Sequence, residues 1–187
     1  SAAISMVLLH QTPMFMIEFA AVQNELTKRG IRSIALDTPG TGMSDRPPGM
    51  PSIEELADNI IPVLDRLGIK RVLVAGHHTG ASIATAFAAR HPERTAGVII
   101  HGVALFSPEV MKRRGGVKGS PWDRTPREDG AHFHGPFEFR RDAAKKFGYA
   151  QSPDDLATVT WMSVGQFLQG DDIGHPAAYA YDLKADL

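Results

Sequence analysis

An α/β fold, with a parallel sheet covered by helices on both faces, is predicted by three features of the sequence. Short apolar runs alternate with amphipathic segments over roughly the first hundred residues, a pattern typical of strands joined by crossover helices. One of these runs leads through a tight turn between Gly76 and Gly80 into a helical segment of small residues. After about Val103 the strand-like runs end and helical patterns follow. We therefore expect a sheet region followed by a second, helical unit.

Four short apolar runs are predicted to form the strands of the sheet. They comprise residues 6–10, 33–37, 72–75 and 98–101. The segments between them are long enough for helices, so the strands are expected to be parallel. The turn-rich loop that starts at Asp37 then lies at the carboxyl end of a strand, where open parallel sheets place their ligand sites.

Two crossover helices are predicted between the first three strands. The first has one apolar stripe at helical spacing, formed by Phe15, Phe19, Val22 and Leu26, and Gly30 ends it. The second, over residues 52–68, begins with a capping box in which Ser52 is followed three residues later by Glu55. Pro62 lies inside this helix and should kink it.

The second unit is predicted to be a helical cap of residues 104–187, after a partial core of residues 1–103. Ser152 is a strong N-cap candidate, because Pro153 takes the first helical position and two carboxylates follow, where the helix dipole favours negative charge. A short last helix is expected around residues 177–183.

Composition excludes several classes of function. The formal net charge is −1 and cysteine is absent, so neither a field that gathers nucleic acid nor a disulfide or thiolate site is expected. No apolar run approaches the length that spans a bilayer. We predict a cytoplasmic, cofactor-free protein whose partner is a small molecule, with no nucleic acid and no membrane. The sequence does not indicate an oligomeric state.

The most informative motif is Gly76-His77-His78-Thr79-Gly80, which joins the third strand to a helix. A G-x-X-x-G turn of this kind is a nucleophile elbow, whose middle residue occupies a strained conformation and whose glycines let strand and helix approach closely. The middle residue here is His78. The amide of Thr79, at the start of the helix, would donate to an oxyanion.

Several segments resemble the α/β-hydrolase superfamily in order and spacing. They are His10-Gln11-Thr12-Pro13, Asp37-Thr38-Pro39-Gly40-Thr41-Gly42-Met43-Ser44-Asp45-Arg46-Pro47, the elbow motif, and Arg90-His91-Pro92-Glu93-Arg94. The branch that they resemble carries a helical cap and includes haloalkane dehalogenases, epoxide hydrolases and carbon–carbon bond hydrolases. The resemblance implies that the chain lacks flanking strands at both ends and comes from a longer protein.

The resemblance also implies roles for individual residues. His78 takes the place of the nucleophile, and Thr12 and Thr79 supply the two oxyanion-type donors. Substrate contacts are expected from His10, Gln11, His77 and Trp161.

Three departures from the family pattern limit what the resemblance implies. Gln11 replaces the glycine that follows the first-strand histidine, and His78 replaces the usual Ser or Asp. The family's acid and general-base histidine would lie beyond Leu187.

A histidine at the elbow has several possible roles. Imidazole can act as a base near neutral pH, as a covalent nucleophile, or as a ligand contact in a pocket without hydrolytic chemistry. A metal site is the other interpretation, since His10, His77, His78 and His101 all lie near carboxyl ends of strands. We predict no metal, because the neighbouring histidines point apart from a tight turn and no paired carboxylates join them.

The leading hypothesis is a hydrolase acting on a small, largely apolar ester, carbon–carbon or carbon–halogen substrate. A non-catalytic ligand-binding protein is the first alternative. The second is a cofactor-free lyase or oxygenase in which a histidine removes a proton from an acidic carbon. A burst of product with a covalent adduct would exclude the binding protein and a simple base. Stabilisation by a ligand without turnover would favour the binding protein, and oxygen consumption would favour the oxygenase.

Overall fold

The computed structural model describes residues 5–103, 109–110, 113, 123, 125–146, 148, 152–169 and 172–187. Its centre is a sheet of four parallel strands in the order β2-β1-β3-β4. The strands are β1 (Ser5–Leu9), β2 (Ser33–Leu36), β3 (Val72–His77) and β4 (Thr95–His101). The predicted α/β class and all four strands are confirmed. The largest boundary differences are that β3 and β4 are longer than predicted.

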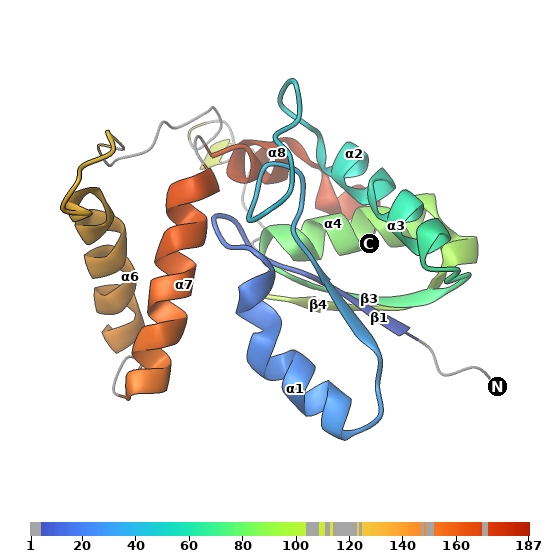
Figure 1. Ribbon diagram of the computed structural model, residues 1–187. Coiled ribbons are helices and arrows are strands. Elements are labelled where there is room, and N and C mark those ends of the chain that lie inside the picture. The colour runs from blue at the N-terminus through green and yellow to red at the C-terminus, as the bar shows by residue number, and fades with distance from the viewer. Residues whose placement is uncertain are drawn as a thin grey trace.

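Helices cover both faces of this sheet (Figure 1). Helix α1 lies on one side, and α4 lies on the other with α2, α3 and α8. The α-helices are α1 (Ala20–Lys28), α2 (Ile53–Asp58), α3 (Ile60–Arg66), α4 (Thr79–Arg90), α6 (His134–Lys146), α7 (Pro153–Gln169) and α8 (Gly174–Ala180). Short 3₁₀ turns are η1 (Met16–Phe19), η2 (Pro92–Arg94), η3 (Ala131–Phe133) and η4 (Leu183–Ala185). No helix in the described part of the chain is long and apolar enough to cross a membrane.

The single kinked helix predicted over residues 52–68 is instead two helices. Helix α2 ends at Asp58, and α3 begins at Ile60 after one residue, Asn59. Pro62 explains the break, because proline has no N–H and its ring clashes with the carbonyl four residues earlier, here that of Asp58. The predicted capping box is present, since Glu55 N donates to Ser52 Oγ at 3.1 Å and Ser52 N donates to Glu55 Oε2 at 2.8 Å.

The main core lies between the sheet and the helices on the α4 side. It includes Val7, Leu9, Val72 and Val74 from the strands and Ile83 and Phe87 from α4. The last segment of the chain also joins it through Ala177, Tyr181 and Leu183. Residues near the C-terminus, within the range predicted as cap, thus pack with the sheet region.

Helices α6 and α7 form an adjacent pair beside this core (Figure 1). The pair rests on the segment after β1, where a Cβ added to Gly165 of α7 would lie 2.0 Å from the ring of Phe15. A second contact joins Arg46 Nη1 to the main-chain oxygen of Gln169 at 3.1 Å. The helical pair therefore lies near the carboxyl ends of the strands.

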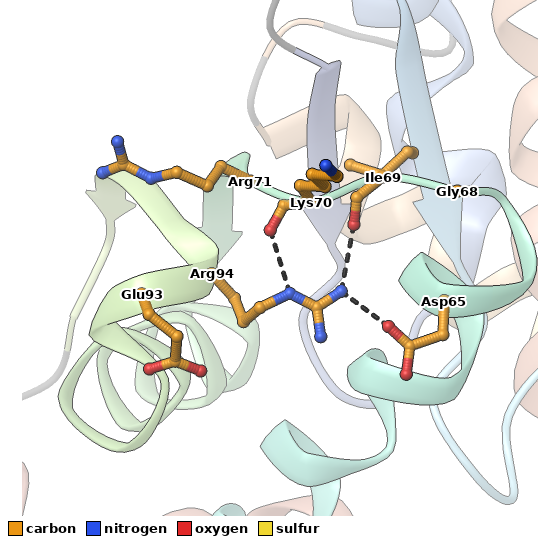
Figure 2. A pocket seen from close by; sticks show the side chains of 7 residues that line it. All are labelled: Asp65, Gly68, Ile69, Lys70, Arg71, Glu93 and Arg94. Atoms are coloured by element: carbon orange, nitrogen blue, oxygen red, sulfur yellow. Dashed lines mark hydrogen bonds and ion pairs between the residues drawn. The ribbon is translucent and has the colours of Figure 1, made fainter.

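A surface groove of about 600 Å³ lies at the opposite, amino end of β3. Figure 2 shows Arg94 at its centre, bonded to the main-chain oxygens of Lys70 and Ile69 and to Asp65 Oδ1 at 2.9, 3.0 and 2.7 Å. Arg94 belongs to η2, and its three partners lie on α3 and on the segment that follows it, so the bonds join these two parts of the chain. We assign this groove a structural role.

Strand β4 forms an edge of the sheet and pairs only with β3 within the described residues. Val98, Ile99 and Ile100 are 39%, 50% and 39% exposed. Consecutive residues of a strand point to opposite faces, so apolar side chains are exposed on both faces of this edge. An unpaired apolar edge strand is a template for pairing with another chain.

We expect the 187-residue chain to self-associate through β4. Placing a charge on the edge should oppose this, so Ile99→Lys should shift the molecule towards monomer in sedimentation velocity. Met43→Lys is the control, because Met43 is an 88% exposed loop residue and the added charge is the same. Equal association of both variants would show that β4 is not the contact.

Candidate functional site

The turn between β3 and α4 holds His78 at the carboxyl edge of the sheet. His78 has φ 50° and ψ −112°, and it is the only non-glycine residue with positive φ in the described part of the chain. Its N–H donates to His101 O at 2.9 Å, which fixes the turn against β4. Such a backbone conformation costs of order 1–3 kcal/mol and persists only where the surroundings enforce it. The side chain of His78 is exposed at this edge.

The two glycines of the motif are required by close backbone contacts. A Cβ on Gly76 would lie 2.0 Å from Gly80 O, and a Cβ on Gly80 would lie 2.0 Å from Leu9 O. These contacts bring the start of α4 against β3 and β1, so no larger residue fits at either position. The strand, the turn and the helix therefore have the close packing that the sequence predicted.

Glu18, on η1, joins two of the predicted site residues. One carboxylate oxygen accepts a very short hydrogen bond from the ring nitrogen Nδ1 of His77, and the other accepts from Gln11 N at 2.9 Å. The main chain after β1 is thus tied to the end of β3. The sequence analysis did not identify Glu18 as a partner of these residues.

Three imidazole rings lie together at the edge of the sheet. The ring centroid of His77 lies 4.7 Å from that of His78 and 4.9 Å from that of His101. Partial desolvation beside the neighbouring rings lowers the pKa of the exposed His78, and the charge of His77 lowers it further. His78 is therefore favoured in its neutral form, the form that can accept a proton. In the described ranges, no three His, Asp or Glu side chains are arranged to hold a metal ion.

His10 is placed differently from an exposed substrate contact. It is 1% exposed, and its Nε2 accepts from Thr38 N at 3.2 Å and lies 3.0 Å from Thr41 Oγ1. Its Nδ1 lies 2.9 Å from Gln11 O, an oxygen that can only accept. These partners require a neutral ring with its proton on Nδ1. Both ring nitrogens of His10 are thus used within the protein to fasten the loop after β2, and the predicted substrate contact stays a prediction.

Acid is expected to destabilise the fold through His10. Burial lowers the pKa of His10 below the ordinary value of 6.5, so the unfolded chain takes up a proton first as the pH falls. The contribution to the free energy of unfolding is complete above pH 6.5 and declines as the pH falls towards the folded-state pKa. Urea denaturation between pH 8 and 5 measures it. The pH slope should be smaller in His10→Gln; an identical slope would exclude His10 as the source.

Thr12 and Thr79, the predicted donors, lie on the segments that meet at the turn. Both residues are buried. Thr79 is the first residue of α4, so its amide has no acceptor within the helix. Thr12 lies against α8, because a Cβ on Gly174 would lie 2.0 Å from Thr12 Oγ1. Their role as oxyanion donors stays a prediction.

A histidine–carboxylate pair at the start of α8 was missed by the sequence analysis. His175 Nδ1 lies 2.5 Å from Asp172 Oδ2, and His175 N donates to Asp172 Oδ1 at 3.0 Å. Burial raises the pKa of Asp172, but the hydrogen bonds from His175 outweigh this and leave it lowered. The charge of His175 also lowers the pKa of His78. The pair therefore lies within electrostatic range of the elbow.

Trp161, the predicted aromatic contact, lies on α7 and is 58% exposed. It follows that Trp161 can contact a ligand only at an open surface of the helical pair, and this contact stays a prediction.

The loop after β2 lines a pocket of about 290 Å³ at the carboxyl ends of β1 and β2. Asp37 organises that loop by accepting from Met16 N at 2.7 Å and from Met43 N at 2.9 Å.

The strand–turn–helix lies at the carboxyl edge of a parallel sheet whose two faces are covered by helices. A family profile described as the alpha/beta hydrolase fold matches residues 4–167. The chain belongs to this family.

Two curated relatives and one solved structure are similar to this chain, the structure in its fold alone. Epoxide hydrolase B of Mycobacterium tuberculosis is 34% identical over 133 residues, which cover 70% of this chain and 36% of that protein. The AB hydrolase superfamily protein YisY of Bacillus subtilis is 33% identical over 109 residues, covering 58% and 40%. The enol-lactonase structure from Burkholderia xenovorans has a TM-score of 0.68 at 24% identity, covering 100% of this chain and 68% of that one. The chain thus spans well under half the length of these two curated relatives.

Proposed function

We propose that the protein is a hydrolase in which His78 occupies the place of the family's nucleophile and acts as a base. The main support for this proposal is the strained turn at His78, which holds the ring at the carboxyl edge of the sheet. The close packing of Gly76 and Gly80 makes this turn possible. Family membership supports hydrolytic chemistry. The lowered pKa of His78 supports a proton-accepting role at neutral pH.

In the proposed reaction the neutral imidazole of His78 takes a proton from water. With an ester substrate, the resulting hydroxide adds to the carbonyl carbon, and the amide of Thr79 and the Thr12 segment stabilise the negative charge on the carbonyl oxygen. The tetrahedral intermediate then collapses, and the imidazolium returns the proton to the leaving oxygen. No covalent bond to the enzyme is needed, so no burst of product is expected.

We propose that the helical pair α6–α7 is a cap over this site, as the resemblance implies. Its contacts to Phe15 and Arg46 place it against the loops at the carboxyl edge. A small, largely apolar ester, carbon–carbon or carbon–halogen substrate would bind beneath it, with Gln11 and His77 among its contacts and Trp161 reaching it from the open surface of the pair.

Two other functions fit particular observations. A non-catalytic ligand-binding role fits the histidine at the elbow, which keeps the turn but not the usual Ser or Asp. A cofactor-free lyase or oxygenase fits the lowered pKa of His78, because a neutral imidazole can remove a proton from an acidic carbon.

The test is turnover of short- and medium-chain aryl esters and haloalkanes, with the wild type beside His78→Ala. Turnover that the alanine variant loses supports the hydrolase. A burst of product with a stoichiometric covalent adduct would show that His78 acts as a covalent nucleophile and not as a base. Oxygen uptake would favour the oxygenase, and stabilisation by a ligand without turnover would favour the binding protein.

A further inference from the structure

The interface of α6 and α7 buries polar groups that have no partner. Arg140, on α6, donates from Nε to Gln166 Oε1 at 2.6 Å, but its Nη2 is inaccessible to solvent and makes no hydrogen bond within the described residues. Gln169, on α7, is 5% exposed, and both Nε2 and Oε1 of its side chain are inaccessible and unpartnered. Three unpaired polar atoms are thus enclosed in one helical pair.

Gln166 links the two residues that carry these unpaired groups. Gln166 and Gln169 are three residues apart on α7 and therefore share a face of the helix. Arg140 contacts Gln166 on that face. Arg46, on the loop after β2, donates to the main-chain oxygen of Gln169 at 3.1 Å. Two arginines from different parts of the fold thus contact residues of α7 that are three positions apart.

The cluster is adjacent to the proposed site. Gln166 follows Gly165, whose Cα packs against the ring of Phe15. Burial lowers the pKa of Arg140, and the charge of Glu18, the residue that joins Gln11 to His77, opposes that shift. An arginine stays protonated at any physiological pH, so the cluster carries a partly buried positive charge. No carboxylate is bonded to that guanidinium within the described residues.

An unpartnered buried polar atom is unfavourable, and an unpaired buried charge is more so. Native proteins keep such groups mainly where a ligand or an ordered water completes them. The unsatisfied donors are Nη2 of Arg140 and Nε2 of Gln169, and two donors beside a positive charge match the two oxygens of a carboxylate.

We propose that Arg140 and Gln169 form an anion subsite that binds a carboxylate group of the substrate. The inference rests on the proposed function, because the ligand is the substrate of that same site, and it narrows the substrate class to an apolar molecule with one carboxylate. Gln169 Oε1 accepts from a hydroxyl or N–H group of the same ligand. Since the three atoms are closed to solvent, the ligand enters when the helical pair separates from Phe15.

The test compares phenylacetate with its neutral analogue phenylacetamide as ligands, in thermal shift and calorimetric titrations at constant ionic strength. Phenylacetate should raise the melting temperature and phenylacetamide should not. In Arg140→Gln the dissociation constant for phenylacetate should rise about 10- to 100-fold, the range for loss of a charge-assisted hydrogen bond.

Arg141→Gln is the matched control. Arg141 is the next residue of α6, it pairs with Asp142 and Glu138 at the surface, and the variant loses the same charge. It should bind phenylacetate as the wild type does. Gln169→Leu is the second variant, in case Arg140→Gln does not fold, and it should weaken binding by about tenfold through loss of one donor.

Equal binding of the acid and the amide, or equal loss in Arg141→Gln, would overturn the subsite. No binding of phenylacetate would also overturn it and would leave water as the partner of these atoms. The readout is binding, so it is separate from the hydrolase proposal. Ester turnover that depends on His78 without carboxylate binding rejects only the subsite, whereas carboxylate binding without any turnover rejects only the hydrolase.

Discussion

Gly80→Ala is expected to lower the free energy of unfolding by about 3 kcal/mol or more, or to prevent folding. The added Cβ would lie 2.0 Å from Leu9 O and 2.8 Å from His10 O, and both atoms belong to the main chain of the central strand region. No side chain can rotate to relieve such a clash. Helix α4 would have to move away from β1 and take the turn at His78 with it.

Gly49→Ala is the control for this substitution. A Cβ on Gly49 meets nothing within 4 Å, and its φ lies outside the positive region that disfavours side chains. The same change of residue should therefore leave stability within about 1 kcal/mol or raise it slightly. Urea denaturation followed by circular dichroism measures both variants. Similar midpoints would mean that the close approach of α4 to β1 does not exist in solution.

Replacing His78 by alanine is expected to lower kcat/KM by about 10²- to 10⁴-fold, the usual contribution of a positioned general base. Alanine keeps a side chain at φ 50°, so the strained turn remains while the imidazole is lost. The melting temperature should change little. Unchanged turnover in this variant would remove His78 from the mechanism.

The pH profile gives an independent test of the same assignment. The neutral ring is the active form and its pKa is lowered by burial and by His77, so kcat/KM should be constant above pH 6.5 and decline only below it. His101 also lowers the pKa of His78 by its charge. His101→Ala should therefore keep turnover at pH 8 and move the acid limb to higher pH. An unmoved limb would show that another group sets it.

The parts of the structure that depend on residues close together in the sequence could be predicted. The capping box of Ser52 and Glu55 and the turn between Gly76 and Gly80 are set by spacing within a few residues, and both are present. The carboxyl ends of the strands meet because parallel strands share one edge. The histidines at the carboxyl ends of β3 and β4 lie together there, whereas His10, after β1, is bonded to the loop after β2.

The missed features all join residues that are distant in the sequence. Glu18 reaches His77 from η1, and Arg140 reaches Gln166 across two helices. No periodicity or motif marks such a pair, because each residue alone reads as an ordinary charged or polar position on a helix. Asp172 and His175 are closer, and their spacing at a helix start is a signal that the sequence analysis overlooked.

The packing of α8 determines the order in which this fold can be completed. Ala177, Tyr181 and Leu183 lie in the core beside strands formed by the first part of the chain, and Gly174 packs against Thr12. During synthesis the sheet and α4 emerge from the ribosome long before these residues do. Until they arrive, the apolar surface that α8 covers faces water or a chaperone, and contacts between such distant residues form slowly. Emergence of α8 from the ribosome, rather than formation of the sheet, is then the step that completes this part of the core.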